Sequence, residues 1–435
     1  MIYFKIDRGV LHQGHVMDVL KEMPPESCHC VISSPPYWSL RSYLDNAHPD
    51  KPYEIGLEKT PEEYIEKIVQ VFREVKRVLH RSGTVWINLG DSYAGSGSPG
   101  GDFRDGKGGD EYLRPYNRKG NGLKPKDLCG IPWRVALALQ ADGWWLRSAI
   151  PWCKRSSMPE SCTDRPASAL EYVFLLAKSQ HYFFDMDAIR IPHKPESIER
   201  CKHSWDGNRD VGYPGSEQTH DMSKMCSPGG RNFRNTDLFY ESITPPHGMI
   251  STEDELIGVD VNPQAMKAAH FATFPEKLVE PCLKAGTSEK GCCPECLEPY
   301  VRMVERVEGK DISWKQSEKT TEKHQGRIDQ GLNSNKSGFN QGSKETYYKN
   351  APRNKTIGWK RNCTCLSAQS HYGFILSDME KTIPCTVLDP FAGSCTVGVV
   401  AEKYRRNWVG IELSEDYAKL AENRVRESIK QRRLF

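Results

Sequence analysis

Residues 386–396 read Thr-Val-Leu-Asp-Pro-Phe-Ala-Gly-Ser-Cys-Thr, and this stretch decides the fold. The apolar residues 386–388 predict a strand, and a helix is expected at 397–404 after a turn that contains one glycine. A second apolar strand is expected at 408–411. Strand, helix and strand in this order predict a βαβ unit, and open sheets built from such units bind ligands at the carboxyl ends of their strands.

The turn after the first of these strands suits a nucleoside that carries no phosphate. Gly393 lets a ligand approach the backbone closely, and Glu412, at the end of the second strand, can accept both hydroxyls of a ribose. The turn has no lysine, so it does not match the loops that grip phosphates. S-adenosylmethionine is a ligand of this kind, whereas an ordinary strand-to-helix turn is the alternative interpretation.

The first half of the chain repeats the α/β pattern. A short strand at 28–34 must end at Pro35, because proline has no amide hydrogen to give to a sheet. Helical spacing follows at 61–80, then an expected turn at 81–83 and a buried strand at 84–89. A further helix is expected at 131–142, and further strands at 145–153 and 170–177.

Residues 34–37 read Ser-Pro-Pro-Tyr and form a rigid turn that suits an exocyclic amine. The prolines carry no amide hydrogen, so this backbone offers only carbonyl acceptors. When the Ser34 hydroxyl and the Pro35 carbonyl accept the two amine hydrogens, the nitrogen lone pair can point at an electrophilic methyl group. Tyr37 is expected to stack on the base. The alternative is a proline-rich turn packed on a core tyrosine.

These two segments resemble the signature motifs of a known enzyme family. The turn at Ser34–Tyr37 resembles motif IV, and the loop at Asp389–Gly393 resembles motif I, of the DNA methyltransferases that methylate amino groups. Because the catalytic turn precedes the cofactor loop, the order resembles the circularly permuted β group. Further segments that resemble the family are Asn88–Tyr93, Pro151–Lys154 of motif VIII followed by Arg165, Pro166, Glu171 and Tyr172, and His270–Pro275 of motif X.

The resemblance implies an α/β fold, the Rossmann-like mixed sheet of the class I S-adenosylmethionine-dependent methyltransferases, with an inserted region that reads the target sequence. It implies catalytic roles for Ser34, Pro35, Pro36 and Tyr37. It implies cofactor contacts for Asp389, Phe391, Gly393, Ser394, Glu412, Phe271, Thr273 and Asp18.

The residue at the head of the turn predicts the target base. Serine is the usual residue there in N4-cytosine enzymes, whereas adenine enzymes more often carry aspartate. We therefore expect methyl transfer from S-adenosylmethionine to the N4 amine of a flipped-out cytosine in duplex DNA, with N6-adenine methylation as the alternative. Trp38, Arg41 and Tyr43 follow the turn and are expected at the pocket or its mouth, with a core position as the alternative for Trp38.

Three residues depart from the family pattern. Cys395 stands where glycine is usual, and it costs about 1–2 kcal/mol if the position requires a positive φ. His15 replaces an aspartate that approaches the cofactor adenine, and Asp18 is expected to substitute for it. Val397 replaces a threonine. The first two departures motivate a third hypothesis, a catalytically decayed zinc-containing DNA-binding protein. Methylation of RNA or protein ranks lower, because the basic insertions suit a long polyanion.

Two cysteine pairs predict a structural zinc site. Cys293 and Cys296 form a C-x-x-C pair, and Cys363 and Cys365 follow after 66 intervening residues. Four thiolates satisfy tetrahedral Zn²⁺ and leave no open position, which is typical of a structural site. A redox switch is the alternative. Between 302 and 361 the chain holds 14 Lys or Arg against 7 Asp or Glu, so the insertion is expected to be a basic flap that contacts DNA.

The remaining features set the expected organisation of the chain. Its 435 residues carry a net charge of +3, so a nucleic-acid site must be a local basic patch. The expected parts are a catalytic part at 1–194 with a mobile basic loop at 95–126, a target-recognition insertion at 195–262, a motif X segment at 263–290, a zinc-ribbon-like insertion at 291–366, and a cofactor-binding part at 367–435.

The expected location and partners follow from what the chain lacks and from its family. The sequence has no apolar leader and no run of 18 apolar residues, so we expect a cytoplasmic protein that does not enter a membrane. The expected partners are double-stranded DNA and a cognate restriction endonuclease encoded separately.

Overall fold

The computed structural model describes residues 1–40, 42–44, 47–94, 122–154, 162–191, 275–307, 353–365 and 382–432, together with the backbone of short strands between 251 and 273. The chain forms two compact units. The first comprises Met1–Ile189, Arg234–Val301 and Trp359–Phe435, and the second comprises Arg190–Phe233 and Arg302–Gly358. The fold and the sites below belong to the first unit.

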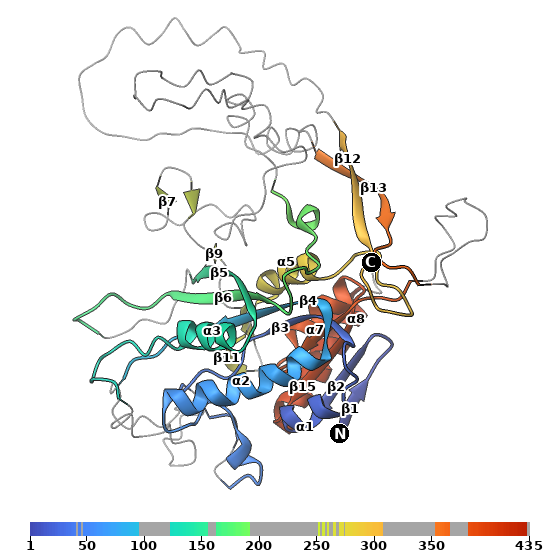
Figure 1. Cartoon of the computed structure of the whole chain (residues 1–435). Helices are drawn as coiled ribbons and strands as arrows, with labels where there is room; N and C mark the ends of the chain where they lie inside the picture. The colour runs from blue at the N-terminus through green and yellow to red at the C-terminus, as the bar shows by residue number, and fades with distance from the viewer. Residues whose placement is uncertain are drawn as a thin grey trace, which may run out of the picture. The chain divides into compact units, whose positions relative to one another are not determined.

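A nine-stranded mixed sheet forms the centre of this unit (Figure 1). In spatial order its strands are β1 (Ile2–Lys5), β2 (Gly9–Gln13), β15 (Asn407–Glu412), β14 (Thr386–Asp389), β3 (Cys28–Ser33), β4 (Leu79–Leu89), β6 (Leu170–Ala177), β5 (Trp145–Cys153) and β9 (Val259–Asp260). The five strands from β2 to β4 run parallel, and β6 is antiparallel to both of its neighbours. The expected Rossmann-like mixed sheet is therefore confirmed.

Helices cover both faces of the sheet (Figure 1). One face carries α1 (Val16–Glu22), α2 (Pro61–Val78) and α3 (Ile131–Ala141), and the other carries α5 (Glu276–Gly286), α7 (Thr396–Lys403) and α8 (Glu415–Arg432). Two short 3₁₀ helices, η1 (Lys51–Tyr53) and η3 (Met186–Ile189), lie in the connections. Among the helices that the structure describes, none combines the length and the apolar character needed to cross a bilayer.

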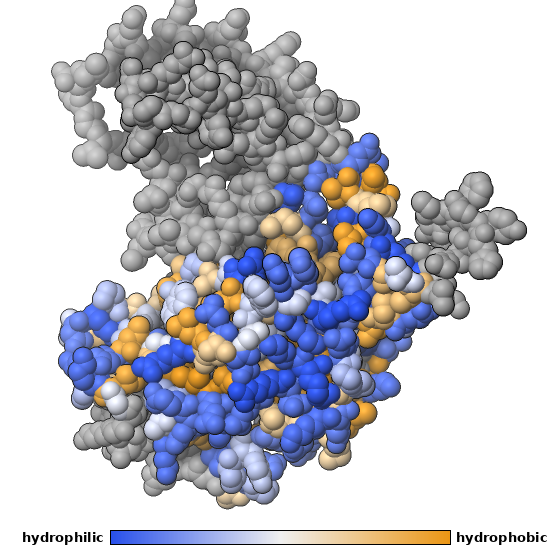
Figure 2. All heavy atoms as spheres, in the orientation of Figure 1, coloured by the Kyte–Doolittle hydropathy of each residue, from blue (hydrophilic) through white to orange (hydrophobic). Residues whose placement is uncertain are grey.

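Helix α2 shows how the local sequence sets an element and its packing. Thr60 caps its first turn by accepting the Glu63 N–H at 3.2 Å, while the Glu63 carboxylate accepts the Thr60 N–H, and Pro61 occupies the first helical turn. Residues spaced three and four apart, such as Tyr64, Ile68 and Phe72, are buried against the sheet side. Hydrophilic side chains predominate over the outward face of this helix in Figure 2.

Three two-stranded sheets complete the described elements. They pair β7 (Ser251–Thr252) with β8 (Glu255–Leu256), β10 (Gln264–Met266) with β11 (Ala269–Thr273), and β12 (Val301–Val307) with β13 (Arg353–Lys360). Most of the expected basic loop at 95–126 and of the target-recognition insertion at 195–262 lies outside the described residues, so both remain predictions.

One local expectation was wrong. Residues 81–83 form no turn before a strand but belong to β4, which is continuous from Leu79 to Leu89. The register explains this, because Cys28 of β3 faces Leu79 whereas Cys30 faces Thr84, so a bulge in β4 takes up the extra residues. β4 pairs with β3 at Leu79 and again from Thr84, and with β6 from Thr84, so residues 81–83 lie between paired positions of one strand.

Candidate active site

The strand order brings two distant segments to one edge of the sheet. Strand β14 lies parallel to β3, with Val387 opposite Cys30, so both strands end at the same edge. There the Ser33 hydroxyl donates to Asp389 Oδ1 at 2.6 Å. This bond joins residues that are 356 positions apart in the sequence, and it ties the start of the proline turn to the start of the glycine loop.

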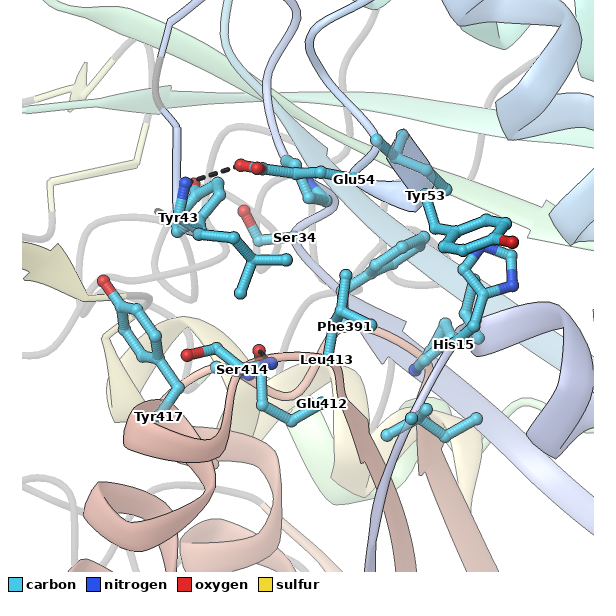
Figure 3. A pocket seen from close by; sticks show the side chains of 18 residues that line it. His15, Ser34, Tyr43, Tyr53, Glu54, Phe391, Glu412, Leu413, Ser414 and Tyr417 are labelled. Atoms are coloured by element: carbon cyan, nitrogen blue, oxygen red, sulfur yellow. Dashed lines mark hydrogen bonds between the residues drawn. The ribbon is translucent and has the colours of Figure 1, made fainter. Parts of the chain in front are cut away.

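An open cavity lies at this edge (Figure 3). Ser34 and Pro36 of the turn line it together with Phe391, Gly393 and Glu412 of the βαβ unit. The serine of the turn and the proposed ribose acceptor therefore face one space.

Two aromatic pairs flank the cavity on opposite sides (Figure 3). The rings of His15 and Tyr53 lie 5.6 Å apart, and those of Tyr43 and Tyr417 lie 5.9 Å apart. All four residues line the cavity. Tyr53 and Tyr417 were missed by the sequence reasoning, because each stands alone at the edge of a short or amphipathic helix without a motif around it.

Glu412 is placed to act as an acceptor in the cavity. Its carboxylate accepts the backbone N–H of Gly393 at 2.8 Å and that of Ser414 at 2.9 Å. Burial raises the pKa of this carboxyl, although both backbone donors favour its ionised form. Gly393 has a φ of +51°, which glycine adopts without strain, and this conformation turns its N–H toward Glu412. The donor and acceptor set therefore fits the ribose of a nucleoside cofactor.

Asp389 joins the two loops and does not line the cavity. Besides the Ser33 hydroxyl, its carboxylate accepts the Phe391 N–H at 3.1 Å. Burial raises the pKa of Asp389 to about 7, with a smaller contribution from the nearby charge of Glu412. The role of this carboxyl in the structure is to hold the glycine loop against the proline turn.

A polar network stands behind the turn, on the side of β4, β5 and β6. Glu171 at the start of β6 accepts the Tyr37 hydroxyl at 2.7 Å and the Asn88 side-chain amide at 2.9 Å, and it pairs with Lys154. Because β6 runs antiparallel to β4 and β5, its first residues lie beside the last residues of both neighbours. The antiparallel strand therefore brings Lys154 and Glu171 to the edge of the sheet where the cavity lies.

This network holds the turn and reaches Ser34. The Ser34 hydroxyl lies 3.4 Å from both the Tyr37 hydroxyl and the Asn88 amide nitrogen. Tyr64 of α2 donates to the Pro36 carbonyl at 2.9 Å. A Cβ on Gly90 would meet the Tyr37 ring at 2.5 Å, so the ring packs directly on the backbone there. Burial, followed by the charge of Glu171, raises the pKa of Tyr37 well above its ordinary value.

Several residues expected at the site lie elsewhere. Asp18 does not line the cavity, and Gly14, His15 and Val16 occupy that wall, because α1 begins at Val16 and carries Asp18 past the cavity. Ser394 also lies off the cavity, and its hydroxyl accepts a bond from Arg424 at 3.0 Å.

The remaining expected residues have different outcomes. Phe271 and Thr273 belong to β11, but their side chains lie outside what the structure describes, so their cofactor contacts stay predictions. Arg41 also lies outside the described residues. Tyr43 lines the cavity as expected, whereas Trp38 is a core residue, only 2% exposed, whose indole N–H donates to the Glu58 carbonyl at 2.9 Å.

Cys395 adopts the strained conformation that its position requires. It has a φ of 58° and a ψ of 42° at the N-terminus of α7, in the left-handed region that glycine favours. Its side chain is buried, and burial raises the pKa of the thiol to about 12, so it stays protonated. Cysteine at this position adds backbone strain, but the loop still places the Gly393 N–H on the Glu412 carboxylate.

The four predicted metal-ligating cysteines come together at a different place in the same unit. The sulfur atoms of Cys293, Cys296, Cys363 and Cys365 all lie within 4.8 Å of one another. The two cysteine pairs, which are far apart in the sequence, therefore lie together in space as the motifs predict.

Known proteins match this chain along most of its length. The N6/N4 family of DNA methylases matches residues 28–293 and 309–423. The Type II methyltransferase M.Cfr9I of Citrobacter freundii is 35% identical over 284 residues, which cover 65% of this chain and 74% of that protein. The Type II methyltransferase M.SmaI of Serratia marcescens is 36% identical over 260 residues, covering 57% of this chain and 85% of that protein.

Among solved structures, a putative DNA modification methylase from Thermus thermophilus, complexed with S-adenosyl-L-methionine, matches with a TM-score of 0.40. It is 16% identical, and the match covers 97% of this chain and 96% of that chain. The family match, spanning both the Ser-Pro-Pro-Tyr turn and the glycine loop, agrees with the cavity that these two segments share. The chain belongs to the DNA methylase family.

Proposed function

We propose that the protein is a Type II modification enzyme that methylates the exocyclic N4 amine of a cytosine in double-stranded DNA. The observation that carries the proposal is the shared cavity, in which Ser34 and Pro36 face Phe391, Gly393 and Glu412. Serine at the head of the turn favours cytosine over adenine. The names of the relatives, all Type II methyltransferases, support DNA as the substrate and a separately encoded restriction endonuclease as partner.

The residues of the βαβ unit fit the methyl donor. When bound, S-adenosylmethionine supplies an electrophilic methyl group on a sulfonium centre. Glu412 accepts the ribose hydroxyls, because its carboxylate faces the cavity and already accepts the N–H groups of Gly393 and Ser414. Phe391 and the ring pair of His15 and Tyr53 provide apolar surface for the purine.

The proline turn prepares the amine for attack. Ser34 and the Pro35 carbonyl accept the two amine hydrogens, which draws the nitrogen toward a tetrahedral shape and frees its lone pair. Glu171 and Asn88 hold the Tyr37 hydroxyl next to Ser34, so the acceptor is positioned before the base arrives. The Tyr37 ring is the surface on which the base stacks.

The target base must leave the duplex to reach this turn. Flipping costs a few kcal/mol, which stacking and hydrogen bonds in the pocket offset. Tyr43 and Tyr417 stand at the cavity on the side opposite to His15 and Tyr53, so aromatic surface is present at both walls.

Nucleoside analysis tests the base. Plasmid DNA is incubated with the purified protein and with S-adenosylmethionine labelled in the methyl group, digested to nucleosides, and separated by chromatography with mass detection. We expect labelled N4-methylcytosine, formed roughly 100- to 1000-fold more slowly by the Ser34→Ala variant. Labelled N6-methyladenine would overturn the cytosine assignment and keep the family. A protein that neither transfers methyl groups nor binds the cofactor in calorimetry would favour the decayed DNA-binding protein.

A further inference from the structure

Four thiols from two separate segments converge within the first compact unit. Cys293 and Cys296 lie between α5 and β12, and Cys363 and Cys365 follow β13 directly. All four sulfur atoms lie within 4.8 Å of one another. A single tetrahedral ion with metal–sulfur bonds of about 2.3 Å places its ligands roughly 3.8 Å apart, which this cluster matches. A cluster of two irons spreads its thiolates over a wider space.

The backbone around the first pair is shaped to receive an ion. The N–H groups of Glu295 and Cys296 donate to the Cys293 sulfur, and the Leu297 N–H donates to the Cys293 carbonyl at 3.0 Å. Leu297 adopts a strained φ of 61° to close this tight turn. In the second pair, the Cys365 N–H donates to the Cys363 sulfur. Such N–H donors stabilise thiolates, the form in which cysteine binds metal.

Side chains outside the four thiols clamp the two pairs together. Arg361 donates to the Cys293 sulfur at 3.4 Å, so a residue from the second segment reaches the first pair. A second contact joins the same two segments, because Glu298 accepts a hydrogen bond from the side-chain amide of Asn362 at 3.3 Å. The two segments are therefore held in register from both sides of the cluster.

We propose that Cys293, Cys296, Cys363 and Cys365 bind one Zn²⁺ ion as four thiolates and form a closed structural site. Zinc is the ion that this donor set favours, because soft thiolates in tetrahedral geometry suit it. Within the part of the chain that the structure describes, no fifth His, Cys, Asp or Glu joins this group of ligands. The ion closes a chain segment of 66 residues between Cys296 and Cys363. Binding energy at such a site contributes directly to folding.

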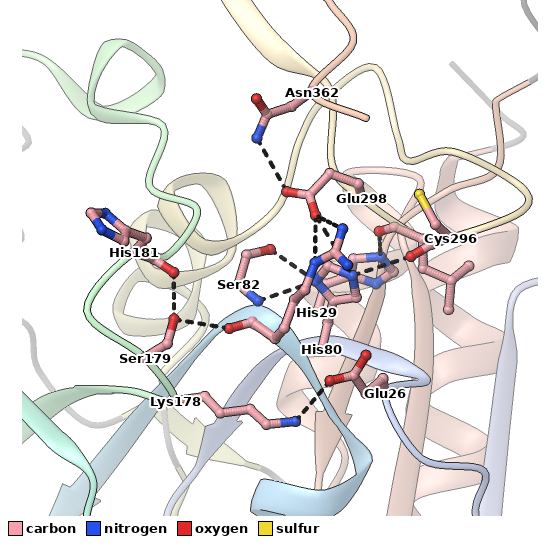
Figure 4. Close-up of polar contacts among 12 residues, drawn as sticks. Glu26, His29, His80, Ser82, Lys178, Ser179, His181, Cys296, Glu298 and Asn362 are labelled. Atoms are coloured by element: carbon pink, nitrogen blue, oxygen red, sulfur yellow. Dashed lines mark hydrogen bonds and ion pairs between the residues drawn. The ribbon is translucent and has the colours of Figure 1, made fainter. Parts of the chain in front are cut away.

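The site is built into the amino-terminal edge of the sheet (Figure 4). His29 of β3 donates from Nε2 to the Leu297 carbonyl at 2.8 Å, while its Nδ1 accepts the Thr386 N–H at 3.0 Å. The His80 ring lies 3.2 Å from the Cys296 carbonyl, and Arg81 donates to Glu298 at 2.8 Å. The cysteine turn thus contacts β3 and β4 directly, and β14 through His29.

A neighbouring group does not compete for the ion. His29, Cys292 and Cys385 also lie within 4.8 Å of one another. However, both ring nitrogens of His29 are engaged by backbone groups, and the Cys292 thiol donates to the Ile383 carbonyl at 3.4 Å. The His29 ring therefore has no nitrogen left for a metal, and we expect one zinc ion per chain and not two.

Metal analysis of the full-length protein tests the proposal. The protein is purified under reducing conditions without added metal or chelator, dialysed, and analysed by plasma mass spectrometry. We expect one zinc per chain in the wild type, and loss of nearly all of it in Cys296→Ser and in Cys363→Ser. The control variant Cys162→Ser, which alters a thiol outside the cluster, should retain the full equivalent, as should Cys292→Ser beside it.

Two measurements keep the test decisive if a variant fails to fold. Wild-type protein refolded with Co²⁺ should show the visible and near-ultraviolet absorption of a tetrahedral four-thiolate site, and Cys365→His should retain the metal with an altered cobalt spectrum. Any of four results would overturn the proposal. They are a metal-free wild type with freely reactive thiols, a disulfide among the four cysteines, iron in place of zinc, and zinc that is retained in both serine variants. None of these readouts depends on methyl transfer, so failure here leaves the proposed reaction untouched.

Discussion

The two edges of the same sheet are built for opposite purposes. At the carboxyl edge, Ser34 makes only long contacts of 3.4 Å and faces an open cavity. At the amino edge, His29 has both ring nitrogens bonded at 2.8 and 3.0 Å, and Glu298 accepts Arg81 at 2.8 Å. The catalytic edge therefore keeps hydrogen-bonding capacity available for ligands, whereas the other edge uses that capacity to hold the cysteine cluster.

Burial also shifts the pKa values of the titratable groups at the two edges. Burial raises the pKa of Asp389 to about 7 and raises that of Glu412, so both carboxyls at the carboxyl edge bind protons more tightly in the folded protein than in the unfolded chain. Burial lowers the pKa of His29 to about 4, so the folded protein excludes a proton at the amino edge.

Removal of the Ser34 hydroxyl is expected to have the largest effect. Ser34→Ala should lower kcat by roughly 100- to 1000-fold, because it deletes an acceptor that acts on the amine during transfer. The Kd for S-adenosylmethionine should change by less than about 3-fold, since Ser34 is only one contributor to the cavity wall. Tritium transfer to plasmid DNA and calorimetry measure the two quantities. Unchanged kcat would remove Ser34 from the reaction.

Loss of the Glu412 carboxylate should act on cofactor binding. Glu412→Ala should raise the Kd for S-adenosylmethionine by roughly 10- to 100-fold, the range expected when a charged acceptor of two hydrogen bonds is deleted. Glu415→Ala is the matched control, because Glu415 pairs with Lys419 on α8 and does not line the cavity. If kcat falls while the Kd measured by calorimetry stays constant, Glu412 does not bind the ribose.

The raised pKa of Asp389 predicts a pH dependence of stability. Between its ordinary pKa of 3.8 and its folded value of about 7, the folded state binds more protons than the unfolded state. The contribution of this group is therefore fully present below the lower value and is lost as pH rises through the upper one, by at most about 1.4 kcal/mol per pH unit. Glu412 adds a contribution of the same sign.

Urea unfolding of the cofactor-free protein measures this effect at about pH 5 and about pH 8. The wild type should lose more stability between these two values than Asp389→Asn, which keeps an acceptor for the Ser33 hydroxyl but cannot ionise. Equal losses in both proteins would show that Asp389 has an ordinary pKa. The comparison with the variant isolates this carboxyl from every other titrating group.

The strain at Cys395 predicts the smallest effect. Cys395→Gly relieves a positive φ of 58°, a gain of about 1 kcal/mol, but it removes a buried sulfur whose packing contributes a similar amount. The free energy of unfolding should therefore change by less than about 1 kcal/mol, and the cofactor Kd should stay within about 2-fold. A thermal and urea unfolding series measures the first quantity. A large loss of stability would mean that the thiol packing outweighs the strain.

Local sequence predicts most of the elements because their signals are local. The strand at 145–153 and the strand at 170–177 match β5 and β6, and α2 begins at Pro61, the first residue of the expected helical stretch. The turn expected at 81–83 was wrong because it depended on a local Ser-Gly preference, whereas pairing at Leu79 and from Thr84 onward makes this segment part of β4. Asp18 lies off the cavity, since the path of α1 decides which of its neighbours faces it.

The sequence by itself determined the chemistry of this protein: a proline turn headed by serine, a glycine loop followed by an acid, and two pairs of cysteines. These are short motifs whose residue types dictate what they can bind. Only the tertiary structure decided which residues lie around these motifs. The strand order places β14 beside β3, and the antiparallel β6 brings Glu171 to Tyr37. The elements η1 and α8 contribute Tyr53 and Tyr417 to the cavity. Contacts between segments hundreds of residues apart depend on pairing across the whole sheet, and no local pattern encodes them.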